Sequence, residues 1–178
     1  MDVKGQLQAI VKTKGATKDG LKEGAKVLAE AISEQLKVKP EEVAIMLLNA
    51  TGQTLVFVWP PPLFTGGAAF PANHKTAIAS GVLATLKGKV DNKISESKHL
   101  KFYESVMGMQ TSKLPIQKMV ALPLFSGDKK LGVVEVSRKG KTPEEAGPNF
   151  TPEDAQALVV LCREASPLIG QLIPEMFL

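Results

Sequence analysis

The most constraining feature of the sequence lies between Lys118 and Leu172, where an apolar hairpin leads through a polar loop into a capped helix. Residues 119–125 and 131–137 are rich in β-branched and large apolar side chains, which favours strands. The short segment between them contains Gly127, which is typical of a tight turn. This order of elements predicts two neighbouring antiparallel strands and a helix that covers one face of their sheet.

The helix of this stretch begins with a favourable capping sequence. Thr151 can accept a hydrogen bond from a free backbone N–H, Pro152 suits the first helical position, and two acidic residues follow at the positive end of the helix dipole. Its apolar stripe consists of Ala155, Leu158, Leu161, Cys162, Ala165, Leu168 and Leu172. We expect a kink or a break at Pro167, because proline cannot donate the helical hydrogen bond.

Two further helices and a second hairpin are predicted upstream. Residues 3–11 form a short amphipathic segment, and residues 18–36 carry apolar side chains at steps of three and four. Strand-like runs at 43–49 and 54–59 are joined by a short loop that contains glycine. Helices that flank two hairpins indicate an α+β fold on an antiparallel sheet. The sequence leaves open whether the 18–36 stripe packs on that sheet or against a second copy of the chain.

The region between the two hairpins is unusually rich in aromatic side chains. Trp59 is followed by three prolines, which end strand pairing, and a loop rich in glycine and proline that contains Phe70 is expected up to about residue 73. Aromatic residues on such a loop either fill the core or line a pocket. The pattern then predicts a helix at 76–86, a short strand at 90–95 and a short helix or lid at 99–107.

The composition is that of a single globular domain. The chain has 178 residues, of which 44% are hydrophobic and 22% charged. We expect a helical extension at 1–16, one domain at 17–173 and a tail at 174–178. The net charge of +4 comes from basic residues spread over the whole length, so no nucleic-acid partner is expected. A single cysteine, and the lack of a membrane span or signal peptide, predict a cytoplasmic protein with no membrane partner.

The same stretch carries a family resemblance. Its segments KMVALPLFSGDKKLGVVEVSRKG and FTPEDAQAL resemble the C-terminal half of a GAF domain, and VDNKISESKHLKFYESVMG resembles the segment that covers the ligand pocket in that family. The resemblance covers about residues 17–170 and is most specific over 118–160. It implies a GAF/PAS-like central antiparallel sheet, with terminal helices on one face and a ligand pocket under residues 60–110 on the other.

GAF domains are mostly regulatory, and the resemblance leaves the ligand or cofactor unknown. Members that bind cyclic nucleotides carry an Asn-Lys pair, a Phe and an Asp-Glu pair. Here those positions read Ser137-Arg138, Phe150 and Glu153-Asp154, and only the Phe matches. Because helix capping already explains the acidic pair, a cyclic-nucleotide domain is the weaker alternative.

No catalytic or metal-binding set can be assembled from the sequence. Bilin-binding members need a cysteine near the pocket, and the free-methionine sulfoxide reductases of the family need reactive and resolving cysteines. Cys162 instead lies on the apolar stripe of the last helix, where a small buried hydrophobic residue is expected. His74 and His99 have no neighbouring ligands at zinc spacing. We therefore expect no enzyme and no bound metal.

Glu135 is the one charged residue inside an apolar strand. Strand alternation places it opposite Val134 and Val136, so it faces the pocket if those valines face the helices. A half-exposed sheet glutamate is the simpler interpretation, and a hydrogen-bond acceptor for a ligand is the functional one. The expected pocket residues are Trp59, Phe70, His74, Phe102, Tyr103, Met119 and Glu135.

Two functional hypotheses follow from this combination. The first is a regulatory domain that binds a small molecule, forms a homodimer through its terminal helices and signals to a separate output protein. The second is a ligand-free scaffold whose aromatic residues fill the pocket, used for dimerisation or partner docking.

Overall fold

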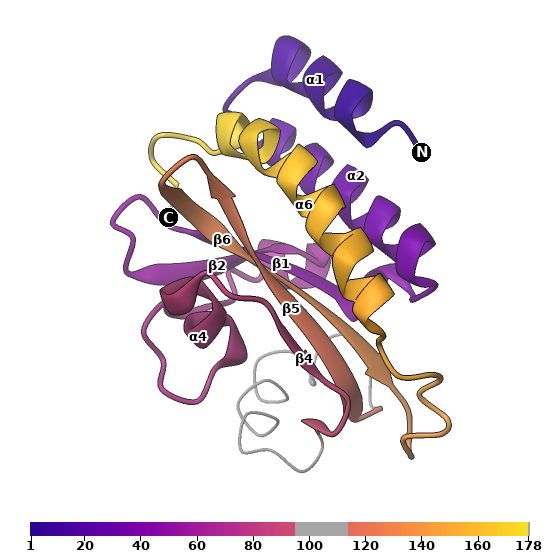
Figure 1. Ribbon diagram of the computed structural model, residues 1–178. Helices are drawn as coiled ribbons and strands as arrows, with labels where there is room; N and C mark the ends of the chain where they lie inside the picture. The colour runs from indigo at the N-terminus through magenta and orange to yellow at the C-terminus, as the bar shows by residue number, and fades with distance from the viewer. Residues whose placement is uncertain (95–113, 178) are drawn as a thin grey trace.

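The computed structural model describes residues 1–94 and 114–177, which form a six-stranded antiparallel sheet with helices on both faces (Figure 1). The strand order is β3-β2-β1-β6-β5-β4. The strands are β1 Val43–Leu48, β2 Thr54–Trp59, β3 Ala69–Pro71, β4 Lys89–Asp91, β5 Ile116–Ser126 and β6 Lys129–Lys139. The helices are α1 Val3–Lys14, α2 Lys18–Leu36, α3 Pro61–Thr65, α4 Ile78–Thr85 and α6 Pro152–Leu172, with a 3-10 turn at Pro40–Glu42. The predicted α+β architecture is confirmed.

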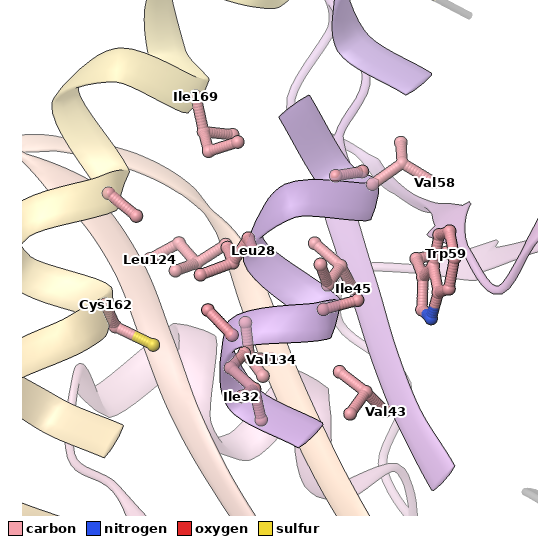
Figure 2. Packing of buried hydrophobic residues seen from close by; sticks show 14 of the residues in the cluster. Leu28, Ile32, Val43, Ile45, Val58, Trp59, Leu124, Val134, Cys162 and Ile169 are labelled. Carbon is pink, nitrogen blue, oxygen red and sulfur yellow. The ribbon is translucent and has the colours of Figure 1, made fainter. Parts of the chain in front are cut away.

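The terminal helices cover one face of the sheet. Figure 1 shows α2 and α6 side by side across the strands, with α1 on their outer side. In Figure 2, Leu28 and Ile32 of α2 point toward Ile45 of β1 and Val134 of β6, while Cys162 of α6 points into the same core. The stripe of residues 18–36 thus packs on the sheet, which answers the question that the sequence left open. Each fully buried aliphatic side chain of this kind stabilises the fold by about 1.5–3 kcal/mol.

Helix α1 shares this core, because its residues Val3, Leu7 and Ile10 are buried against α2 and α6. A glycine permits the close approach of α2 and α6. A Cβ atom at Gly24 would lie only 2.4 Å from Cδ1 of Leu172, the end of a flexible side chain. Helices α2 and α6 are therefore closely packed at this point.

The opposite face of the sheet is covered by α4, α3 and the segment that leads into β3. Its core contains Ala44, Met46, Leu55, Phe57, Leu63, Phe70, Ala77, Ile78, Ala79, Val82, Leu83, Ile94, Ile116, Met119, Ala121 and Val133. In β1 the two cores alternate residue by residue from Val43 to Leu47, as the side-chain period of a strand requires. Among the described residues, no helix has the length and apolar character needed to cross a bilayer.

The structure corrects two expectations about local structure. The break considered at Pro167 is absent, because α6 continues to Leu172, and since Pro167 is exposed, water can replace the hydrogen bond that its ring removes. The expected loop after Trp59 instead forms α3, whose first turn accommodates two prolines, and the edge strand β3. The lid expected at 99–107 lies outside the described residues.

Gly132 offers a test of the sheet geometry. A Cβ atom at this position would lie 2.0 Å from the Met46 carbonyl oxygen and 2.8 Å from the Leu47 Cα, so the alanine variant must push β1 and β6 apart. We expect Gly132→Ala to lower the free energy of unfolding by about 1–3 kcal/mol, measured by urea denaturation. Gly81→Ala on α4 is the control, because open space surrounds that position. It should leave stability unchanged or raise it, and equal losses in both variants would contradict the close approach.

Candidate functional site

The candidate site is centred on Glu135, in the middle of β6. Its partners across the sheet are Ala44 on β1 and Ala121 on β5. Val134 and Val136 lie in the core under the terminal helices, so the Glu135 side chain points to the face covered by α4. The side chain is only 1% exposed, and the interpretation as a half-exposed sheet glutamate is therefore wrong.

The Glu135 carboxyl group is buried without a counterion. Among the residues that the structure describes, neither of its oxygens has a partner with acceptable hydrogen-bond geometry. Burial raises the pKa of Glu135 to about 8, because an apolar environment disfavours the charged form, while the nearby Ala79 N–H lowers the pKa and offsets part of this effect. The Ala79 N–H lies close enough to act on the carboxyl group electrostatically without forming a hydrogen bond to it.

Ala79 belongs to the first turn of α4, a helix whose N-cap residue Ala77 has no side chain able to cap it. The carboxyl of Glu135 therefore lies near the positive end of that helix, where free N–H groups favour an anion. A protonated Glu135 can donate one hydrogen bond and accept others, and an ionised one needs donors or a cation. The group thus has unused capacity to bind a polar molecule.

Three of the seven expected pocket residues share this face. Met119 lies on β5 two residues from Ala121, and Phe70 of β3 packs in the same core with its ring 5.9 Å from that of Phe57. Both side chains are almost fully buried. Glu135, Met119 and Phe70 are therefore placed on the predicted face, and a role for them in ligand binding stays a prediction.

The sequence predicts Trp59 in the pocket with Glu135, but the structure places it on the other face of the sheet. Ile45 pairs with Trp59 but Met46 pairs with Phe57, so Val58 is the extra residue of a β-bulge. The bulge turns both Val58 and Trp59 toward α2, and the Trp59 Nε1–H donates to the Pro40 carbonyl oxygen at 2.8 Å. Trp59 therefore belongs to the core under the terminal helices, as Figure 2 shows.

The remaining expected residues are not part of this cluster. His74 lines a surface groove of about 470 Å³ beside α4, and its Nδ1 lies 3.3 Å from the Thr76 hydroxyl oxygen. Phe102 and Tyr103 lie outside the described residues. Sequence reasoning missed Ala44 and Ala121, because only the strand register shows that two small residues flank Glu135.

The positions weighed for a cyclic nucleotide are occupied by structural contacts. Ser137 donates a hydrogen bond to the Glu42 carbonyl oxygen at 3.2 Å. Arg138 donates to the Leu36 carbonyl oxygen at 3.1 Å, and its guanidinium lies 4.6 Å from the centre of the Phe150 ring. Thr151 caps the start of α6, as the sequence predicts, and Asp154 completes a reciprocal capping box with it.

The other reactive groups of the chain lie elsewhere. Cys162 is 3% exposed in the core under the terminal helices, and burial raises the pKa of its thiol to about 12. A thiol of this kind is a poor nucleophile, because the thiolate is the reactive form. Within 1–94 and 114–177, no three His, Cys, Asp or Glu residues are grouped so that they could hold a metal ion.

The raised pKa of Glu135 predicts a pH-dependent stability. The folded protein holds a proton that the unfolded chain releases at its ordinary pKa of 4.5, so stability is greatest below pH 4.5 and falls as the pH rises to about 8. We expect the free energy of unfolding to fall by up to about 1.4 kcal/mol per pH unit in this window, relative to Glu135→Gln. Urea denaturation of the unmodified protein and of Glu135→Gln from pH 5 to 9 measures this fall in the free energy of unfolding.

The control for this experiment is Glu41→Gln, which changes an exposed glutamate in the turn before β1. It should reproduce the pH profile of the unmodified protein. Parallel profiles for the unmodified protein and Glu135→Gln would contradict a buried protonated carboxyl group.

Comparison with known proteins identifies the fold. No protein-family model matches the sequence, and no curated protein matches it. Among solved structures, the GAF domain of an Acinetobacter phosphoenolpyruvate-protein phosphotransferase is 17% identical, with a TM-score of 0.64, and the match covers 94% of this chain and 90% of that one. The GAF domain of the Coxiella burnetii phosphoenolpyruvate-protein phosphotransferase is 12% identical, with a TM-score of 0.65 and coverage of 96% and 90%.

An enzyme also has this fold. Free methionine-R-sulfoxide reductase from Neisseria meningitidis, solved in complex with its substrate, is 19% identical, with a TM-score of 0.57 and coverage of 95% of this chain and 87% of that one. Identities this low show the fold and not the activity. On this evidence the chain has the fold of a GAF domain.

Proposed function

We propose that this chain is a regulatory domain that binds a small molecule on the face of the sheet covered by α4 and signals to a separate output protein. The observation that carries the proposal is the buried carboxyl group of Glu135, which has no acceptable hydrogen-bond partner among the described residues. Burying a polar group without a hydrogen bond is unfavourable in free energy. A ligand with a complementary polar group would form that hydrogen bond and offset the cost. Strongly perturbed pKa values also cluster at functional sites.

The buried position of the single cysteine supports a function without catalysis. A reductase mechanism would need an accessible thiolate, and the only cysteine in the sequence, Cys162, is buried on the other face of the sheet. Regulatory GAF domains are frequent among the similar structures, including that of a sensor histidine kinase from Bacillus halodurans.

A ligand-free scaffold is the second candidate function. It is favoured by the packing of Phe57, Leu63 and Phe70 on the α4 face, where the protein's own side chains occupy space above the sheet. In that case Glu135 would stay protonated in the folded state, and its role would be limited to its position beside the first turn of α4.

Native mass spectrometry of the purified protein separates the two functions. We expect a complex heavier than the chain by the mass of a small molecule, and a higher melting temperature when that molecule is added. Glu135→Gln should weaken its binding about tenfold, because the amide cannot reproduce the hydrogen bonds that the buried carboxyl group makes to the ligand. Glu41→Gln should bind it normally. A bare chain mass, with no stabilisation by any compound of a metabolite library, would favour the scaffold.

We also propose that the chain forms a homodimer through the outer side of α1, α2 and α6. A groove of about 590 Å³ runs along this surface, between α2 and the outer side of α6. It is lined by Met1, Val3, Ala31, Glu34, Gln35, Ala157, Val160, Leu161 and Glu164. Val160 is 48% exposed and Met1 60%, and apolar exposure on one face of a helical layer suits self-association.

Val160→Glu tests the dimer, because it adds a third negative charge to a groove that already contains Glu34 and Glu164. Light scattering coupled to size-exclusion chromatography should show a dimer for the unmodified protein and a monomer for this variant. The control is Val90→Glu, which alters a similarly exposed valine, at 42%, on the edge strand β4. A monomeric unmodified protein at high concentration, or a dimer that survives Val160→Glu, would contradict the proposal.

A further inference from the structure

A second cavity lies on the opposite face of the sheet from Glu135. It is a groove of about 510 Å³ at the end of the sheet that carries β2 and β3. Val56 of β2 contributes both to this groove and to the core under the terminal helices, which places the groove on the helical side. A cavity of this size is typical of sites for small organic ligands, which span about 300–1,000 Å³.

The groove follows from the way the helices cover the sheet. Helix α2 packs mainly on β1 and β2, and its first turns form one wall of the groove through Lys18 and Leu21. The C-terminal segment forms another wall and is held in place by its backbone. The Ala50 N–H donates to the Phe177 carbonyl oxygen at 2.9 Å, and the Phe177 N–H donates to the Pro174 carbonyl oxygen at 3.1 Å.

Most of the lining is apolar. Leu21, Val56, Phe64, Ala69 and Phe177 form the walls, and Leu21 and Phe177 are themselves buried in the main core. These walls are therefore anchored by the fold and do not depend on a ligand. Met176 also lines the groove and is 88% exposed, so an apolar side chain stands at the opening with little contact to the protein.

One cation lies at the groove. Lys18 is the first residue of α2 and lines the cavity, and its ammonium group lies 5.6 Å from the centre of the Phe64 ring. Among the described residues, Lys18 makes no salt bridge. Its charge is therefore available to an anionic group on a ligand whose body occupies the apolar walls.

We propose that this groove binds an amphiphilic carboxylate with an apolar hydrocarbon chain, since its volume lies within the range of sites for small organic ligands. Its hydrocarbon chain lies against Val56, Phe64 and Phe177, and its carboxylate pairs with the Lys18 ammonium. Thr54 and Thr65 also line the groove and supply hydroxyl groups that can donate hydrogen bonds to an oxygen of the ligand. This site is separate from the Glu135 face and does not depend on the function proposed for it.

Isothermal titration calorimetry with decanoate below its micelle concentration tests the proposal. We expect decanoate to bind and to raise the melting temperature, and decanol to bind more weakly because it carries no charge. Lys18→Gln should weaken decanoate binding at least fivefold and leave decanol binding unchanged. Lys22→Gln, which removes an exposed lysine from the same helix, is the matched control and should bind both as the unmodified protein does.

A second variant tests the cavity itself. Ala69 lines the groove on an exposed edge strand, so Ala69→Trp fills the cavity without disturbing the core, and it should abolish binding of both compounds. Glu135→Gln, on the other face, should bind decanoate normally.

Three outcomes would overturn the proposal. The first is a lack of decanoate binding to the unmodified protein, and the second is equal decanoate binding by Lys18→Gln. The third is a dimer that Ala69→Trp disrupts, which would show that a second copy of the chain fills the groove.

Discussion

The structure depends on the alternation of side chains along β6, the strand at the centre of the sheet. Val134 and Val136 enter the core under the terminal helices, while Val133 and Glu135 face α4. Because a shift of one residue would exchange the two faces, the pairing of β6 with β1 and β5 sets both cores at once. Gly132 allows the backbones of β6 and β1 to approach closely at the start of this pairing. The same register places the only buried carboxylate of the described residues beside the first turn of α4.

This arrangement places a titratable side chain beside the start of one helix. Helix α4 has no side-chain cap, and the Glu135 carboxyl lies near its free N–H groups. An ionised Glu135 would attract the positive end of the helix but would remain costly to bury among Ala44 and Ala121. A ligand that forms hydrogen bonds with the Glu135 carboxyl group would change both its attraction to the helix and the free-energy cost of burying it. A coupling of this kind would let the proposed regulatory domain convert ligand binding into a structural change.

The elements were largely predictable from the sequence, and the site was predictable only in part. Apolar periodicity located α2, β1, β2 and the β5–β6 hairpin, because each pattern is local, and the cap at Thr151 fixed the start of α6. Strand alternation also gave the correct face for Glu135. It failed for Trp59, because a bulge in β2 depends on pairing with β1 and leaves no mark in the sequence. The full burial of Glu135 likewise depends on helix α4, which is remote from β6 along the chain.

The contact at Gly24 has a mechanical consequence. Since a glycine lets α2 approach Leu172 of α6, sliding one of these helices along the other would drive the Leu172 side chain against the α2 backbone. A displacement that crosses the sheet from the α4 face would therefore carry α2 and α6 together rather than shift one past the other.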